Sequence, residues 1–281
     1  MIRLSAFADE AGDSLGEQIS ALVENGLKWV DVRNINGKNV SLFTDAEAHG
    51  YAEALFDKGI RIACIGSPIG KRDFCTFSEL KPSLYRIIEI AKIFQTDRIR
   101  IFSFYSHGNR GEDVARCLLQ AVEFAADYGI RLYHENELGI YGESPERCLE
   151  LIKATGIGCI YDPANFVLSG YESVSAEKIL TPLSDFYHIK DARASGEIVP
   201  AGKGEGNLRE LLKCDDVLLT VEPHLFEFGG YAALTDRTMN KSEFIYRNQR
   251  EAFDAGINAV KELLCENGFV VSGNGEWRKE L

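Results

Sequence analysis

Four polar side chains stand at the carboxyl ends of four successive apolar segments of the chain: Glu135, Asp162, His188 and Glu222. Their separations are 27, 26 and 34 residues, each close to the length of one strand and helix. Three carboxylates that share one place repel one another unless a cation joins them. Carboxylate and imidazole ligands without a thiol suit Mn²⁺, Mg²⁺ or Co²⁺ better than structural zinc. The pattern therefore predicts a site for one divalent metal ion.

The first of these residues lies in a run of four polar side chains, HENE, at residues 134–137. Successive side chains of a strand point to opposite faces. If Glu135 points toward the metal site, His134 and Asn136 point away from it, and we expect His134 to pack in a neighbouring layer. Glu137 then lies in the following loop, where it contacts substrate or faces solvent.

These residues need a framework that brings the ends of several strands together. Eight short segments rich in Ile, Val and Leu have the character of parallel strands buried on both faces: 2–7, 28–33, 60–66, 97–104, 130–135, 157–162, 185–191 and 217–222. Each is followed by a segment with helical spacing: 15–26, 44–59, 78–94, 112–128, 144–156, 176–183, 207–214 and 242–266. Eight such units in 281 residues predict an α/β protein, a (β/α)8 TIM barrel with a single domain over 1–281. In that fold the active site lies at the carboxyl ends of the strands, where the four polar residues stand.

The alternative fold for alternating strands and helices is an open α/β sheet. Its nucleotide-binding form carries a G-x-G-x-x-G sequence after the first strand, and this chain has none there. The glycine-rich segment AGKGEG, at 201–206, follows the seventh strand instead. It lacks the residue order of a Walker loop, so it is weak support for phosphate binding.

Composition narrows the class of protein further. The net charge is −12 and the pI is about 5.0, which argues against a general nucleic-acid binder, because such proteins carry a basic face. No segment approaches 18 consecutive apolar residues, so no membrane span is expected. The seven cysteines form no C-x-x-C pair, and the N-terminus is too acidic for a signal peptide. We therefore expect reduced, mostly buried thiols in a cytoplasmic protein.

Four groups of motifs resemble one family of enzymes. The segments YHENELGIYGES, YDPANF, HIKDA with VPAGKGEG, and TVEPHL are similar to the sugar phosphate isomerase/epimerase group of xylose-isomerase-like TIM barrels. The resemblance extends from Ile2 to about Leu264 and is strongest between Arg131 and Leu225. This superfamily includes tagatose and psicose 3-epimerases, hydroxypyruvate isomerases, inosose dehydratases and endonuclease IV.

The resemblance implies a metal site and a reaction. In the epimerases a Glu-Asp-His-Glu set binds one divalent ion, often manganese, and the two glutamates act as acid and base. By position, that set corresponds here to Glu135, Asp162, His188 and Glu222. Mn²⁺ is expected first, with Mg²⁺, Co²⁺ or Zn²⁺ as alternatives. Glu135 and Glu222 would be catalytic, in the isomerisation or epimerisation of a sugar or sugar phosphate through a cis-enediolate.

Other polar residues near the strand ends are expected to hold the substrate: Asn165, Arg193, Arg33, Lys190, Tyr105 and His107. Asn165 stands three residues after Asp162, where the epimerases often have histidine. Arg33 can donate two parallel hydrogen bonds to an anion. Lys190 is also adjacent to Asp191, with which it can form a local ion pair.

Three other functions match parts of this pattern. An inosose-type dehydratase uses the same four ligands, whereas a non-catalytic sugar-binding barrel would not need both glutamates. An endonuclease IV-like nuclease is disfavoured, because it needs more histidines than the five present and an Asp-x-His sequence where this chain has EIVPA. Related barrels often dimerise, which favours a homodimer but leaves the oligomeric state open. The expected substrate is a small-molecule sugar or sugar derivative. Neither nucleic acid nor a membrane is expected as a partner.

Overall fold

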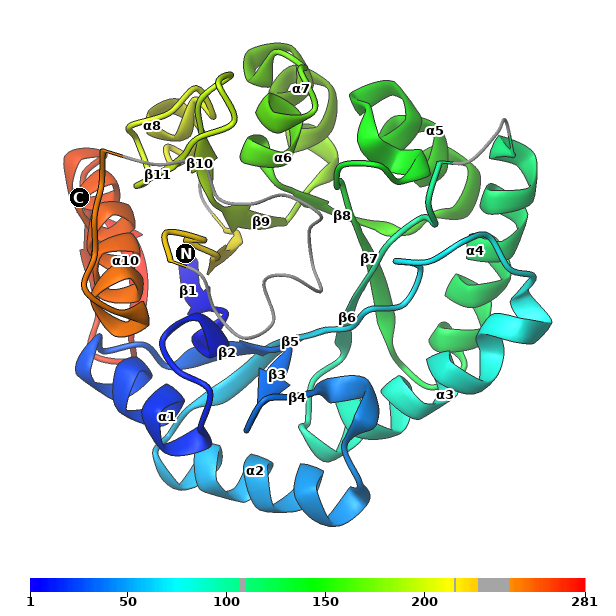
Figure 1. The fold of residues 1–281 in the computed structure, drawn as a ribbon, viewed down its shortest axis with the longest axis horizontal. Coiled ribbons are helices and arrows are strands. Elements are labelled where there is room, and N and C mark those ends of the chain that lie inside the picture. The colour runs from blue at the N-terminus through cyan, green and yellow to red at the C-terminus, as the bar shows by residue number, and fades with distance from the viewer. Residues whose placement is uncertain (107–109, 215, 227–242, 281) are drawn as a thin grey trace.

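Eight parallel strands form a closed barrel, and helices surround it (Figure 1). The computed structural model describes residues 1–106, 110–214, 216–226 and 243–280. The barrel strands are β1 (Ile2–Ala6), β2 (Trp29–Val32), β5 (Arg61–Gly66), β6 (Arg98–Ile101), β7 (Arg131–Glu135), β8 (Gly158–Tyr161), β9 (Phe186–Ile189) and β12 (Leu218–Val221). Neighbouring strands follow the order β1-β12-β9-β8-β7-β6-β5-β2, and a parallel bridge between Phe7 and Asp31 joins the ends of β1 and β2. This arrangement confirms the predicted TIM barrel.

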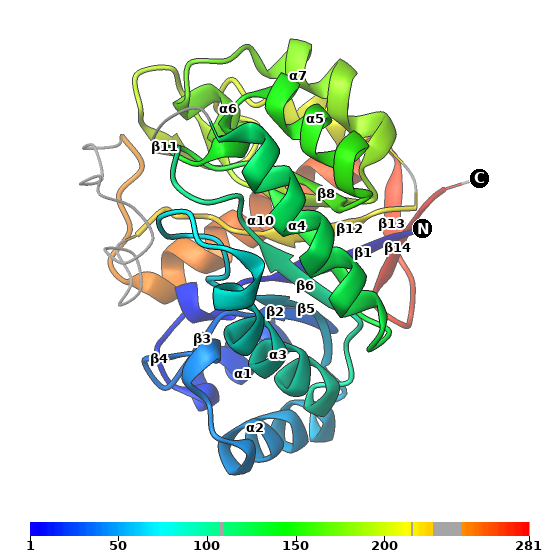
Figure 2. The same ribbon diagram turned by 90° about the vertical axis from the view of Figure 1, so that its right-hand side faces the viewer.

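Most of the helices connect successive barrel strands and lie on the outside of the barrel (Figure 2). They are α1 (Leu15–Glu24), α2 (Asp45–Asp57), α3 (Phe77–Ile93), α4 (Gly111–Ala126), α5 (Pro145–Thr155), α6 (Pro163–Leu168), α7 (Ser173–Leu180), α8 (Leu208–Leu211) and α10 (Gln249–Glu266). The N-cap residues Ser14, Thr44 and Ser144 directly precede α1, α2 and α5. Each side chain accepts a hydrogen bond from the backbone N–H three residues later. These caps fix where the helices begin and therefore how long the preceding loops are.

Short elements occur at the ends of the barrel. Single turns of 3₁₀ helix cover Ala8–Glu10, Val40–Leu42, Tyr141–Glu143 and Thr181–Leu183. Three antiparallel pairs are β3 (Asn34–Ile35) with β4 (Lys38–Asn39), β10 (Asp191–Ala192) with β11 (Ile198–Val199), and β13 (Phe269–Val271) with β14 (Glu276–Lys279). Because β14 also pairs with β1, the C-terminal hairpin extends the barrel sheet on one side. These hairpins were not predicted from the sequence.

The last helix differs from its predicted range. It was expected to begin near Ser242, a residue that lies outside the described part of the chain. Residues 243–248 are not helical, and α10 begins at Gln249. Asn248 sets this start, because its side chain accepts a hydrogen bond from a backbone N–H in the first turn.

The helical region between β8 and β9 also differs. The sequence predicted one helix over 176–183, but α7 begins earlier, at Ser173, and a 3₁₀ turn replaces it at Thr181. Pro182 cannot donate the backbone hydrogen bond that an α-helix needs at that position. The short helix α6, which begins at Pro163, was not predicted; its proline fits the first helical position.

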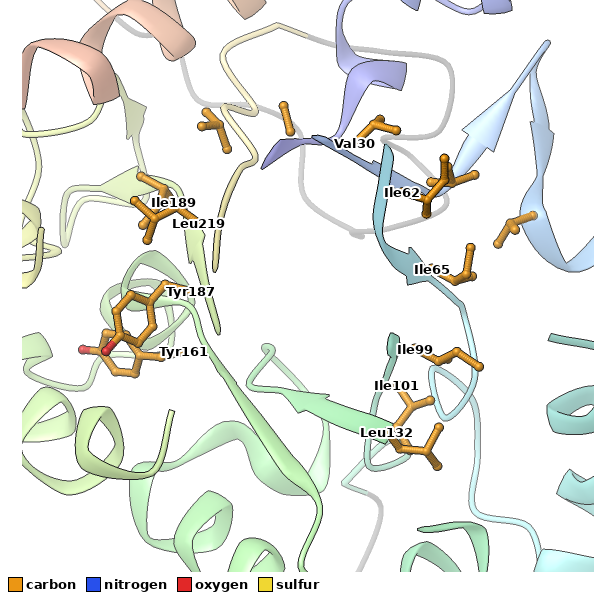
Figure 3. Packing of buried hydrophobic residues seen from close by; sticks show 14 of the residues in the cluster. Val30, Ile62, Ile65, Ile99, Ile101, Leu132, Tyr161, Tyr187, Ile189 and Leu219 are labelled. Carbon is orange, nitrogen blue, oxygen red and sulfur yellow. The ribbon is translucent and has the colours of Figure 1, made fainter. Parts of the chain in front are cut away.

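Successive side chains of the barrel strands point alternately to two packing layers. One face packs against the surrounding helices, and residues of this layer are labelled in Figure 3: Val30, Ile62, Ile65, Ile99, Ile101, Leu132, Tyr161, Tyr187, Ile189 and Leu219. The other face points into the barrel, where Tyr133 and Phe186 belong to a separate apolar cluster. Because Tyr187 and Ile189 pack in the outer layer, His188 between them points into the barrel.

Two expectations from composition can be compared with the structure. Among the described helices, none combines the length and the apolar character that a membrane span needs. All seven cysteines are free thiols: five are buried, Cys214 is half-buried and Cys265 is exposed. The expectation of mostly buried, unpaired thiols is confirmed.

Candidate metal centre

The four predicted ligands meet inside the barrel at the carboxyl ends of its strands. Glu135 ends β7, Asp162 follows β8, His188 lies in β9, and Glu222 follows β12. All four side chains are buried. Each offers one ligand atom, and these atoms all lie within 4.8 Å of one another. The structure therefore brings together the residues that the sequence spacing singled out.

Glu135 contacts one guanidinium and one imidazole. Its Oε2 accepts a hydrogen bond from Arg100 Nη1 at 2.5 Å, and its Oε1 lies 2.7 Å from His188 Nδ1. Burial alone would raise the pKa of Glu135, but His188 and Arg100 outweigh burial and lower that pKa to about 2. Glu135 is therefore a carboxylate at neutral pH, which is the form that binds metal.

Glu222 has a positively charged or protonatable neighbour near each oxygen. Its Oε1 accepts a hydrogen bond from Arg33 Nη1 at 2.6 Å and lies 3.2 Å from His224 Nε2. Its Oε2 lies 3.6 Å from Lys190 Nζ and 3.7 Å from His188 Nδ1. Burial opposes the charged form, but Lys190, His224 and Arg33 hold the pKa of Glu222 well below its usual range. Glu222 is therefore also a carboxylate at neutral pH.

Asp162 is the least compensated of the three carboxylates. Its Oδ2 lies 3.1 Å from Lys190 Nζ but has no hydrogen-bond partner among the described residues. Burial raises the pKa of Asp162 to about 6; Glu135 and Glu222 add to this rise, and Lys190 opposes it. The charged form of Asp162 thus lacks a full partner, and a cation beside Oδ2 would supply one.

Ion pairs extend the cluster to the end of β1. Arg33 also pairs with Asp9 at 2.9 Å and with Glu10 at 3.2 Å. The described ion pairs connect five carboxylates with three permanent cations: Asp9, Glu10, Glu135, Asp162 and Glu222 with Arg33, Arg100 and Lys190. Three positive charges against five negative ones leave a charge of −2 when the imidazoles are neutral. This charge and the donor set both fit one divalent metal ion.

A second group has donor atoms within 4.8 Å of one another: Glu10, Glu222 and His224. Here the Arg33 guanidinium already contacts both carboxylates. Arg33 was expected to bind substrate, but its side chain is only 1 % exposed and is surrounded by carboxylates of its own chain. It supplies the positive charge that this second group needs.

Two asparagines connect the ends of β7 and β8. Asn136 Nδ2 donates to the Asp162 backbone oxygen, and the Asp162 N–H donates back to Asn136 Oδ1, both at 2.9 Å. Asn165 Nδ2 donates to the Asn136 carbonyl at 2.8 Å, and the Asn165 N–H donates to Asp162 Oδ1 at 3.0 Å. These four bonds fix the position of Asp162 relative to the strand that carries Glu135.

The remaining residues predicted to bind substrate have different surroundings. Arg193 lies beyond β10, where it pairs with Glu197 at 2.8 Å and with Glu243 at 2.5 Å. Tyr105 is 39 % exposed, and His107 lies outside the described residues. Of the six predicted residues, three are brought to the cluster: Arg33, Lys190 and Asn165.

Several residues of this ion-pair network were not predicted from the sequence: Asp9, Glu10, Arg100 and His224. One signal was available, because Arg100 lies between Ile99 and Ile101, and a strand whose apolar residues face the helices must point the intervening residue into the barrel. His224 has a positive φ of 49°, which is uncommon outside glycine, and its N–H donates to Glu10 Oε2 at 2.7 Å. No local sequence pattern indicates that contact, because the two residues are 214 positions apart in the sequence.

The glycine-rich segment at 201–206 binds a carboxylate of its own chain. Asp191 Oδ2 accepts hydrogen bonds from the N–H groups of Gly202 and Gly204, both at 2.9 Å, and Oδ1 accepts one from Gly206 at 3.0 Å. Lys190 contacts Asp162 of the four-residue cluster, so Asp191 finds its partners in this loop rather than in the expected local pair. The loop therefore gives no support for a phosphate site.

Gly204→Ala is expected to destabilise the protein. A Cβ at this position would lie closer than 3.0 Å to Asp191 Oδ1 and to Ala192 O, so the loop would have to move. Overpacking of this kind costs about 1–3 kcal/mol.

Gly50→Ala is the matched control, because a Cβ there meets nothing within 4 Å and the residue lies inside α2. It is expected to be neutral or to stabilise by up to about 1 kcal/mol. Equal melting temperatures of the two variants would contradict this role of the loop.

The sequence matches the family model of xylose isomerase-like TIM barrels over residues 19–214. No curated protein matches the sequence significantly. The match covers more than two thirds of the chain and includes three of the four clustered residues, Glu135, Asp162 and His188.

Solved structures share the fold at low sequence identity. An L-ribulose 3-epimerase is similar with a TM-score of 0.73 and 14% identity, covering 95% of this chain and 96% of that one. The probable 3-DHS dehydratase AsbF of Bacillus anthracis, involved in petrobactin synthesis, has a TM-score of 0.70 and 16% identity, with coverages of 92% and 98%. The IolI protein with a bound zinc atom has a TM-score of 0.72 and 14% identity, with coverages of 94% and 99%. At these identities the likeness establishes the shared fold.

Proposed function

The chain belongs to the family of xylose isomerase-like TIM barrels, and we propose that it is a divalent-metal-dependent isomerase or epimerase of a sugar or sugar phosphate. The observation that carries this proposal is the cluster of four donor atoms within 4.8 Å of one another. The residues that would hold the ion are Glu135, Asp162, His188 and Glu222. We propose Mn²⁺ first, because most of the donors are carboxylates, and Zn²⁺ as the alternative, because the similar IolI protein binds zinc.

Glu135 and Glu222 are the proposed proton carriers. They reach the cluster from different strands, and His188 Nδ1 lies between them, 2.7 Å from one carboxylate and 3.7 Å from the other. One glutamate, as a carboxylate, removes a proton from the carbon next to a carbonyl. The other glutamate first takes up a proton from water and then returns it to the substrate. Return to the opposite face of the same carbon gives epimerisation, and return to the neighbouring carbon gives isomerisation. A divalent ion, when bound, supplies a Lewis acid that makes the first proton easier to remove.

Lys190 is proposed to stabilise negative charge that develops on a substrate oxygen. Its ammonium group is buried beside Asp162 and Glu222. Burial alone would lower the pKa of Lys190, but Asp162 and Glu222 raise it above its ordinary value, so the group remains protonated. A fixed positive charge in a dry site acts more strongly than the same charge in water.

A dehydratase is the second candidate, because the similar AsbF protein is described as a probable dehydratase. Incubation of the Mn²⁺-loaded protein in D₂O with ketoses, ketose phosphates and inososes separates the alternatives. Deuterium at the carbon next to the carbonyl, without loss of water, supports an isomerase or epimerase. Loss of water supports the dehydratase. Binding of a sugar with neither deuterium uptake nor loss of water would contradict both and favour a sugar-binding barrel.

Removal of metal is expected to lower the melting temperature. A ligand that binds only the native state stabilises it by about 2.7 kcal/mol at a hundredfold excess over its Kd. Each kcal/mol changes the melting temperature of a domain this large by about 2–4 °C. Protein in chelator should therefore melt roughly 5–10 °C below protein saturated with Mn²⁺. Asp162→Asn should reduce this difference, because it removes an anionic ligand and part of the repulsion in the metal-free protein. Equal melting temperatures of the parent with and without Mn²⁺ would rule out the metal site.

A further inference from the structure

Several buried polar atoms in and beside the cluster of four residues lack a hydrogen-bond partner among the described residues, and Asp31 Oδ2 and His188 Nε2 are among them. The side chain of His188 is fully buried, and Asp31 is 2 % exposed. Asp31 lies on β2 and is not one of the four clustered residues. A buried polar group without a partner costs about 1–3 kcal/mol, so each of these atoms requires an explanation.

Asp31 and His188 lie close together in the barrel interior. Asp31 Oδ1 accepts hydrogen bonds from Ser5 Oγ at 2.6 Å and from Thr220 Oγ1 at 3.0 Å. Thr220, on β12, is the direct neighbour of His188 in the parallel register with β9. Burial lowers the pKa of His188, but neighbouring carboxylates, with Asp31 among them, raise it. Asp31 thus interacts electrostatically with this imidazole, and its Oδ2 has no other described partner.

The two ring nitrogens of His188 have different surroundings. Nδ1 lies 2.7 Å from Glu135 Oε1 and 3.7 Å from Glu222 Oε2, so Nδ1 is the nitrogen that faces the other ligands. A neutral imidazole that binds a metal through Nδ1 carries its proton on Nε2. In a dry interior that N–H needs an acceptor. Asp31 Oδ2 is a buried acceptor in this region that needs a donor.

We infer, on the basis of the proposed metal site, that Asp31 is a positioning residue for His188. Neither atom has a direct hydrogen-bond partner among the described residues, so the bond from Nε2–H to Asp31 forms through one water molecule or after a small side-chain rotation. This bond keeps Nδ1 available for the metal. A carboxylate in this position also makes the ligating nitrogen more basic. Asp31 contacts neither metal nor substrate in this scheme and acts through His188.

Asp31→Asn tests the inference without changing any of the four ligands. The hydroxyl groups of Ser5 and Thr220 should keep the amide oxygen in the position of Oδ1, so that an NH₂ group replaces Oδ2. A donor facing Nε2 favours the tautomer that carries its proton on Nδ1, where the proton competes with the metal. Isothermal titration with Mn²⁺ should give a Kd about 10–100-fold weaker than that of the parent, while near-ultraviolet circular dichroism shows the parent fold. A Kd equal to that of the parent would overturn the inference.

Ser5→Ala is the matched control. It removes one hydrogen bond to Asp31 in the same buried region but leaves the carboxylate in place. Its Kd for Mn²⁺ is expected to remain close to that of the parent. If Ser5→Ala weakened binding as much as Asp31→Asn, the effect would come from packing of this region, and a positioning role for Asp31 would be rejected.

The inference can also be tested on the parent protein, so that the result does not depend on whether a variant folds. In protein saturated with Zn²⁺, which is diamagnetic, the Nε2–H proton of His188 should give a downfield nuclear magnetic resonance signal that exchanges slowly with water. The signal is assigned by its loss in His188→Gln. Absence of such a signal from the zinc-bound parent would overturn the inference. Failure of the parent to bind Mn²⁺ or Zn²⁺ at all is a separate result, which would reject the metal site itself.

Discussion

Glu135→Gln and Glu222→Gln are each expected to abolish turnover. Each substitution removes a proposed metal ligand and proposed proton carrier, while it keeps the size of the side chain. Loss of a general acid or base alone lowers the rate about 10²–10⁴-fold, and a weakened metal site lowers it further. Both glutamates are held as carboxylates by positive neighbours, so glutamine changes the charge of the cluster at every pH near neutrality.

The two variants are expected to differ in stability. In Glu135→Gln, the buried Arg100 loses the carboxylate that it contacts at 2.5 Å, and a buried charge is left without that partner. In Glu222→Gln, Arg33 keeps its ion pairs with Asp9 and Glu10. Glu135→Gln should therefore melt at the lower temperature, although both variants are expected to be inactive.

Solvent exchange of the substrate proton is the measurement that checks the loss of activity. Deuterium uptake at the carbon next to the carbonyl reports proton removal even when no net product forms. Glu137→Gln is the matched control, because it lies two residues from Glu135 but pairs with Lys71 at 2.8 Å. It should exchange at close to the parent rate. An exchange rate near that of the parent in either active-site variant would exclude the mechanism with two glutamates.

The positions of the four clustered residues could be predicted because the fold repeats. Each barrel strand begins and ends at the same two ends of the barrel, so a residue at the carboxyl end of one strand lies near the corresponding residue of the next. The periodic sequence therefore determined that Glu135, Asp162, His188 and Glu222 would meet. The order of the elements is sufficient for this prediction, and short apolar segments and helix caps indicate that order in the sequence.

The partners of these residues could not be predicted in the same way. An arginine in a sequence is usually exposed, and nothing near Arg33 indicates that its guanidinium is buried against Glu222, 189 residues away. The same limit applies to Asp191, whose carboxylate accepts hydrogen bonds from a glycine-rich loop that the sequence alone presents as a weak phosphate site. In both cases the expected external anion is replaced by a carboxylate of the same chain: Glu222 pairs with Arg33, and Asp191 occupies the glycine-rich loop.

Arg33→Met is expected to cause the largest loss of stability among these variants. The Arg33 side chain is only 1 % exposed and pairs with three buried carboxylates: Asp9, Glu10 and Glu222. Removal of one partner from a buried ion pair costs about 3–5 kcal/mol, because the remaining charge stays out of water. For a domain of this size, the melting temperature of the metal-free protein should fall by roughly 6–20 °C. Thermal unfolding in chelator measures this change.

The metal site makes this prediction more specific. A divalent ion beside Glu222 offsets part of the negative charge that Arg33→Met leaves behind, so Mn²⁺ should raise the melting temperature of this variant more than it raises that of the parent. Arg116→Met is the matched control, because the Arg116 side chain is exposed and pairs only at the surface of α4, with Asp113 at 3.5 Å. Its loss should change stability by no more than about 1 kcal/mol, with or without metal. If both variants melted alike in chelator, the buried carboxylates would not depend on Arg33. If they melted apart but responded equally to Mn²⁺, the ion would not share its site with Glu222.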